Sequence, residues 1–198
     1  MRKRLPGLVL AISAFFSVIA QDSLAGLYTP ICIGAWTPYQ IPGDTFSVVG
    51  GKAGIYVACE DLLGIDFGII TKVRNSVTGI QFGFIGNQAD VSASGIQFGF
   101  ICNQVGRDSP VRDEYFTGAR MGAINLCFGV SKGVELGAFN YSKNQMSGVQ
   151  FGFFNITHTM KGVQFGIANV AEKLYGLQIG IINTDDSGRW LPLANVGW

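Results

Sequence analysis

Hydrophobic and polar residues alternate with a period of two along most of this chain. The stretch 148–155 reads Gly-Val-Gln-Phe-Gly-Phe-Phe-Asn. Val149, Phe151 and Phe153 share one face of this stretch, and the glycines and the glutamine share the other. Such alternation predicts a β-strand, and β-branched and aromatic residues in the apolar positions favour a strand over a helix. We therefore expect an all-β chain.

The same phrase recurs nine times, which indicates an architecture built from internal repeats. Each copy runs glycine, apolar, polar, apolar, glycine, apolar, apolar and then, in most copies, asparagine. The short polar stretches between copies leave room only for turns. The copies start at Gly50, Gly64, Gly79, Gly95, Gly118, Gly133, Gly148, Gly162 and Gly176.

The last three copies define the repeat most clearly. Their structural residues are Gly152, Gln150, Asn155, Gly166, Gln164, Asn169, Gly180, Gln178 and Asn183. The second glycine is present in every copy, and because glycine weakens a strand interior, its recurrence predicts a close approach of two backbones. The asparagine comes one place later as Asn87 and Asn103, which predicts a bulge. Val57 and Thr71 replace it in the first two copies.

The third position of every copy is polar, and its four charged members form two pairs of opposite sign in neighbouring copies. Lys52 precedes Asp66, and Arg120 precedes Glu135. If successive copies pair side by side, each charge gains a cross-strand partner. This predicts an enclosed polar face, on which an unpaired charge is costly. The alternative is a chance pattern on a solvated face.

Two architectures fit this pattern. The leading expectation is an antiparallel β-barrel of about 10–12 short-looped strands, as in outer membranes, with the apolar face toward lipid and the Gly/Gln/Gly face inside. Further strands near Leu27–Trp36 and Trp190–Trp198 would complete it. The alternative is a parallel β-solenoid with one copy per coil and stacked Gln and Asn ladders. The identical phrase in every strand favours the solenoid, whereas the shortness of each coil counts against it.

Residues 1–25 have the order of a signal peptide. A basic start at residues 2–4 precedes an apolar run over 8–19 and small residues ending at Ala25, with Ala20 as a second possible cleavage site. The run is shorter than the ~20 residues of a spanning helix, the other interpretation. We expect an exported protein with a single β-repeat domain over 26–198, at the outer membrane or cell surface.

The composition argues against a disordered protein and against a nucleic-acid-binding protein. Hydrophobic residues make up 48% and charged residues 14% of the chain, which excludes intrinsic disorder. The net charge of +1 gives no footprint for nucleic acid. The cysteines are widely spaced without a C-x-x-C motif, so we interpret them as small apolar residues, although export would permit disulfides. They are Cys32, Cys59, Cys102 and Cys127.

Candidate chemistry is sparse. His158 is the one histidine, in a turn, and neither a nucleophile elbow nor a His-Glu-x-x-His motif is present. We expect no catalytic, cofactor-binding or metal-binding residues. The stretch 104–117 has mixed charges and Pro110, which predicts a surface loop that either contacts a protein partner or is a tolerated insertion.

The repeats, the opening Pro38-Tyr-Gln-Ile-Pro42 and the ending Leu191-Pro-Leu-Ala-Asn-Val-Gly-Trp198 together resemble the bacterial surface-repeat proteins of spirochaete type. The resemblance covers residues 27–198 and implies an exported, surface-associated protein without catalytic residues. We therefore expect a non-enzymatic structural or interaction role, and the apolar face of the expected barrel would have outer-membrane lipid as its partner. The alternatives are a narrow outer-membrane pore and a secreted solenoid adhesin.

Overall fold

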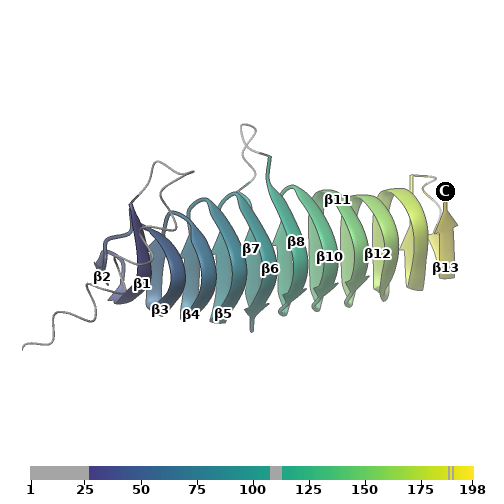
Figure 1. Cartoon of the computed structure of the whole chain (residues 1–198). Helices are drawn as coiled ribbons and strands as arrows, with labels where there is room; N and C mark the ends of the chain where they lie inside the picture. The colour runs from purple at the N-terminus through teal and green to yellow at the C-terminus, as the bar shows by residue number, and fades with distance from the viewer. Residues whose placement is uncertain (1–26, 108–112, 187, 189) are drawn as a thin grey trace, which may run out of the picture.

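Successive copies of the repeat lie side by side and form the coils of an elongated stack (Figure 1). The computed structural model describes residues 27–107, 113–186, 188 and 190–198. These residues form an all-β chain, and the predicted signal peptide over 1–25 lies outside them. The strands are β1 (Tyr28–Trp36), β2 (Tyr39–Ile41), β3 (Ser47–Cys59), β4 (Leu62–Val73), β5 (Ser76–Ala89), β6 (Ser92–Gly99), β7 (Cys102–Val105), β8 (Tyr115–Met121), β9 (Ile124–Cys127), β10 (Val130–Leu136), β11 (Phe139–Phe151), β12 (Phe154–Thr184) and β13 (Trp190–Gly197).

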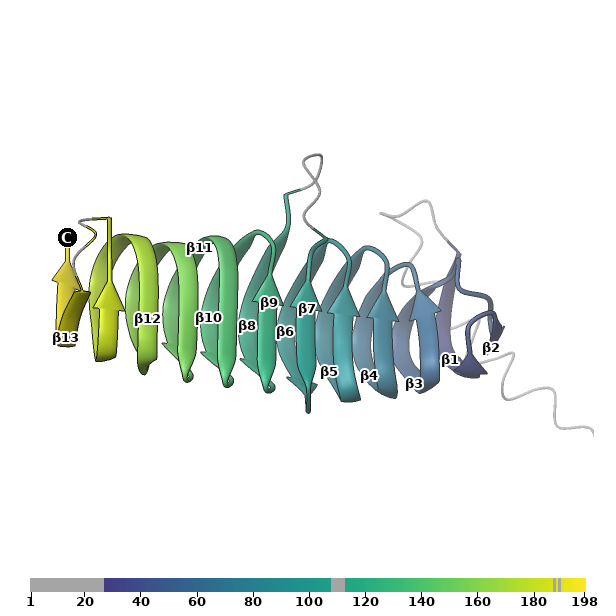
Figure 2. The same cartoon turned by 180° about the vertical axis from the view of Figure 1, so that it is seen from behind.

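Neighbouring copies pair in parallel and in register. Gly133 pairs with Gly148, which pairs with Gly162 on its other side. From β3 to β12 every ladder is parallel. In Figure 2, the arrows of β7 and β9 stand side by side in this arrangement. The fold is a parallel β-solenoid of about nine turns.

The leading expectation of an antiparallel barrel is therefore wrong, and the alternative of a parallel solenoid is confirmed. The short coil counted against a solenoid only if phenylalanines had to fit inside it. Phe151 and Phe153 instead point outward, each with 59% of its surface exposed. The interior holds Gln and Asn side chains together with small or slender apolar ones such as Met146, and Phe116 is the one buried phenylalanine among the described residues.

Each coil bends at its second glycine. In the seventh copy the bend falls at Gly152–Phe153 and separates the end of β11 from the start of β12. Four columns of side chains point inward from each coil. Two are mainly apolar, and Met146 and Met160 belong to one of them. The other two are the third and eighth repeat positions, which are mainly polar and buried.

The first glycine of every copy adopts a backbone conformation that other residues rarely adopt. Its φ lies between +121° at Gly133 and +146° at Gly176, a region that costs an L-residue strain. A Cβ on Gly148 would also lie 2.0 Å from the carbonyl oxygen of Gly133. The second glycine is equally crowded, since a Cβ on Gly152 would lie 2.2 Å from the oxygen of Gly137. The close approach predicted for the second glycine is present, and the structure adds one at the first glycine.

The two end segments close the stack. At the start, β1 pairs in parallel with β3, and β2 folds back antiparallel onto β1. Gln40 of β2 is 8% exposed, donates to the Ala58 carbonyl at 2.7 Å and accepts the Ala58 N–H at 3.1 Å. At the other end, β13 pairs antiparallel with β12, and Asn195 donates to Gln178 Oε1 at 3.0 Å. Asn195 thus gives the last glutamine of the third-position column a partner, whereas Gln40 satisfies backbone groups of the first coil.

Two irregularities interrupt the repeat. The extra residue of the third copy produces the predicted bulge, because Gly68 and Ile70 of β4 pair with Gly83 and Gly86 of β5. The stretch 104–117 is only partly a loop. Its first two residues belong to β7 and its last three to β8, so that prediction was too long.

Candidate functional site

The third repeat positions form one buried column of side chains along the solenoid. In the last coils Gln178 donates to Gln164 at 2.9 Å, and Gln164 donates to Gln150 at 2.8 Å. In the first coils Gln97 donates to Gln81 at 2.8 Å. Each amide N–H therefore points toward the start of the chain. Both runs end on a carboxylate, because Gln81 donates to Asp66 at 3.2 Å and Gln150 donates to Glu135 at 2.9 Å.

The structure brings together both charge pairs that the sequence singled out. Lys52 Nζ lies 3.0 Å from Asp66 Oδ2, and both side chains are almost fully buried. Lys52 also donates to the carbonyls of Val57 at 2.9 Å and Lys72 at 2.6 Å. Burial raises the pKa of the Asp66 carboxyl despite the opposing charge of Lys52. Desolvation of this carboxylate thus outweighs its attraction to the lysine, as is common for buried pairs.

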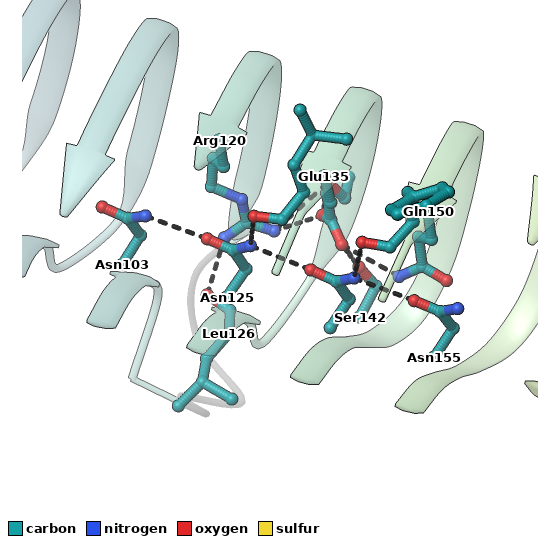
Figure 3. Close-up of polar contacts among 12 residues, drawn as sticks. Asn103, Arg120, Asn125, Leu126, Glu135, Ser142, Gln150 and Asn155 are labelled. Carbon is teal, nitrogen blue, oxygen red and sulfur yellow. Dashed lines mark hydrogen bonds and ion pairs between the residues drawn. The ribbon is translucent and has the colours of Figure 1, made fainter. Parts of the chain in front are cut away.

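The second pair is surrounded by further donors (Figure 3). Arg120 donates to Glu135 and to the Leu126 carbonyl, the latter at 2.8 Å. Ser131 and Ser142 also donate to Glu135. These serines occupy the two interior columns that are apolar in most coils. The apolar columns are thus interrupted at the coil where a charge must be solvated.

The eighth positions form a second, uninterrupted ladder. Each asparagine donates to the next at 2.7–2.9 Å, and Figure 3 shows the part from Asn103 to Asn155. Thr71 donates to Asn87 at 2.7 Å and so starts the ladder without an amide of its own. The asparagine donors point toward the end of the chain, opposite to the glutamine donors. The amide dipoles of the two ladders therefore oppose each other.

The outer surface of the coils is divided into two edges. The second, fourth, sixth and seventh repeat positions point outward around the second-glycine bend, and in all nine copies they hold hydrophobic residues or glycine. We call this surface the apolar edge. It includes Phe67, Phe84, Phe100 and Ile181, which are 66–72% exposed. With strands ~4.8 Å apart, the nine coils extend the edge over about 40 Å.

Two grooves lie on the apolar edge, one over each half of the solenoid. In both, second glycines form the floor and the fourth and sixth positions form the walls. The groove over the last coils encloses about 660 Å³ and includes Phe151, Phe153 and Ile167. The groove over the first coils encloses about 580 Å³ and includes Phe82 and Phe98. Among the described residues, no charged or amide side chain lines either groove.

Chemical groups outside the polar core are dispersed. His158 Nδ1 lies 2.7 Å from Glu172 Oε2 on the surface. Cys32, Cys59, Cys102 and Cys127 are free thiols, the first, second and fourth of them buried. In the part of the chain that the structure describes, no cluster of three or more His, Cys, Asp or Glu side chains could hold a metal ion. Among the residues that the structure describes, there is also no helix long and apolar enough to span a membrane.

The remaining loop residues make contacts within the chain. Arg107 pairs with Asp90 at 2.8 Å, and its backbone N–H donates to Glu114 at 2.7 Å. Phe116 is buried, and the Arg120 guanidinium lies 4.4 Å from the centre of its ring. Phe116 is thus a core residue of β8, although the sequence placed it in the loop.

Sequence reasoning missed the continuous apolar edge as a feature of a solenoid. The alternation of the repeat does indicate an outward apolar face, but this face was assigned to the lipid-facing wall of a barrel. The capping roles of Gln40 and Asn195 were also missed, because neither lies in a repeat copy.

Comparison of the chain with protein families, with curated proteins and with solved structures finds no match.

Proposed function

We propose that this protein is a non-enzymatic, exported surface protein that docks onto a lipid layer through its apolar edge. The observation that carries the proposal is the uninterrupted edge of outward hydrophobic residues across all nine coils. Soluble monomers rarely expose an apolar patch larger than a few hundred Å². The resemblance to bacterial surface-repeat proteins and the basic and apolar start of the chain support location at the outer membrane or cell surface.

The chemistry of the grooves favours hydrocarbon over a peptide. A peptide laid along a groove would bring backbone N–H and C=O groups that need partners. The groove walls are hydrocarbon side chains, and the backbone at the glycine floor is engaged between the coils. Gly152, for example, donates its N–H to the Phe165 carbonyl at 3.0 Å. An acyl chain needs no hydrogen bond and gains by burial at about 25 cal/mol per Å².

The filled interior of the solenoid favours attachment over the alternative of a narrow pore. The interior is occupied by the two amide ladders and the two mainly apolar columns, and Gln150, Asn155 and Met146 have no exposed surface. The role we propose is therefore attachment, with the loop near residues 104–117 as a secondary contact for a protein partner.

Flotation with vesicles tests the proposed function. The chain that begins at Gly26 should float with phosphatidylcholine vesicles in a density gradient. Phe84→Ser and Phe153→Ser together should reduce flotation, because they place hydroxyls on the apolar edge. The matched control is Thr78→Ser and Ser147→Thr, which changes outward residues beside the edge. A chain that stays at the bottom of the gradient with every vesicle composition would refute lipid docking.

A further inference from the structure

The charged residues around the apolar edge are not distributed evenly. Two columns flank the edge, one directly before the first glycines and one directly after the eighth positions. Their charged members are Lys72, Lys132 and Lys161, and neither column contains an acidic residue in any copy. Glu60 and Asp90 belong instead to the turns between β3 and β4 and between β5 and β6, and Glu172 lies within β12 outside both columns.

The lysines of the pre-glycine column form one site. Lys132 pairs in register with Ser147, and Ser147 pairs with Lys161. The two lysines are therefore two strand spacings apart, or about 10 Å. Both are exposed. Their neighbours in the column are Thr117 before Lys132 and Tyr175 after Lys161, so no carboxylate in the column neutralises them.

Neither the column after the eighth positions nor the first four copies of the pre-glycine column has such a site. Lys72 Nζ lies 3.9 Å from Asp90 Oδ2 and only 16% of its side chain is exposed. In the first four copies the pre-glycine column holds no charge, because its residues are Val49, Leu63, Thr78 and Ser94. The positive site therefore lies beside the groove of the last coils and has no counterpart beside the groove of the first coils.

Resting on the proposed function, we infer that Lys132 and Lys161 bind the phosphates of anionic lipid headgroups when the apolar edge lies on a lipid layer. Lysine keeps its ammonium group at the water boundary while its methylene stem covers apolar surface. Each lysine close to an anionic surface adds roughly a factor of five in affinity, or about 30-fold for the two. Without residues 1–25, which hold Arg2, Lys3, Arg4 and Asp22, the chain carries a net charge of −1, so the preference for anionic lipid depends on this local column.

Vesicle partitioning of the chain that begins at Gly26 tests the inference. The probes are vesicles of phosphatidylcholine alone and vesicles that also contain phosphatidylglycerol. The wild type should bind the anionic vesicles more tightly, and added salt should reduce the difference. Lys132→Gln with Lys161→Gln should remove about 30-fold of binding to anionic vesicles and leave binding to neutral vesicles unchanged. The matched control, Lys143→Gln with Lys173→Gln, removes the same charge nearer the opposite turns and should retain the preference.

The outcomes separate the two claims. If the wild type binds both vesicle types equally, lipid docking stands and headgroup binding by the lysines is refuted. If the control variant loses as much as the flank variant, general charge rather than this site causes the preference, and the inference is again refuted. If the wild type binds neither vesicle type, the proposed function fails and the inference fails with it. Circular dichroism of each variant verifies that the solenoid is folded.

Discussion

Gln97 and Arg120 occupy paired positions on β6 and β8, yet each keeps a buried polar atom without a hydrogen-bond partner. These atoms are Gln97 Oε1 and Arg120 Nε. The junction divides the third column into two blocks. Each block begins with a cation, continues with a carboxylate and ends in glutamines whose donors point back toward that carboxylate. The blocks meet where the long insertion separates the fourth and fifth copies.

The first prediction is that a glutamine at this junction is less important for stability than one inside a block. Gln97 donates to Gln81 and accepts nothing, whereas Gln164 both donates to Gln150 and accepts from Gln178. Gln164→Met leaves two neighbouring amides short of a partner, and Gln97→Met leaves one. An unsatisfied buried group costs about 1–3 kcal/mol, so Gln164→Met should be more destabilising by that amount. Urea unfolding measures the difference, and equal losses would contradict it.

The second prediction concerns the buried pair of Arg120 and Glu135. Removing one partner leaves a buried charge and should cost about 3–5 kcal/mol. Replacing both by glutamine should be milder than the sum, because glutamine occupies this column in five of the other seven copies. A double-mutant cycle with Arg120→Gln and Glu135→Gln, followed by denaturant unfolding, measures the coupling. Additive effects within ~0.5 kcal/mol would show that the pair contributes no interaction energy.

The third prediction separates crowded glycines from permissive ones. Gly148→Ala should destabilise the solenoid, because its φ is +133° and the added Cβ would lie 2.0 Å from the Gly133 oxygen. Gly152→Leu should be worse than Gln150→Ala, since overpacking against backbone costs about 1–3 kcal/mol or more. Gly51→Ala is the control, because nothing lies within 4 Å of its added Cβ.

Thermal unfolding compares the glycine variants. Gly51→Ala should be neutral or slightly stabilising, since alanine restricts the unfolded chain. If Gly148→Ala unfolded at the wild-type temperature, the positive φ and the close carbonyl would not be constraints on the fold.

The fourth prediction concerns alkaline pH. Burial raises the pKa of the Cys59 thiol from 9.0 to about 12. Above pH 9 the unfolded chain loses this proton and the folded chain retains it, so the folded state binds more protons and stability falls as pH rises. The slope from this thiol approaches ~1.4 kcal/mol per pH unit between the two pKa values. Cys59→Ala should show a shallower fall in the free energy of unfolding above pH 9 than the wild type. Equal slopes would contradict the assignment.

The sequence by itself determined the strand type, the repeat boundaries and the enclosure of the third position. These follow from local alternation, so Gln150 and Phe151 are assigned to opposite faces whatever the fold. The pairing of Lys52 with Asp66 also followed, because charges in one repeat position meet whenever neighbouring copies lie in register. The strands near both ends were predicted for the same local reason, and they are β1 and β13.

Only the tertiary structure decided between barrel and solenoid. Both architectures bury one face of each strand and expose the other, and local alternation does not encode whether the next copy runs parallel or antiparallel. That choice depends on the bend at the second glycine, as at Gly152, which returns the chain to the same direction within a single repeat. It also depends on the positive φ of Gly148 and on contacts such as Asn155 to Asn169, which form only when successive coils stack. The same stacking collects the outward residues into one apolar edge and leaves the turns to carry the surface acids.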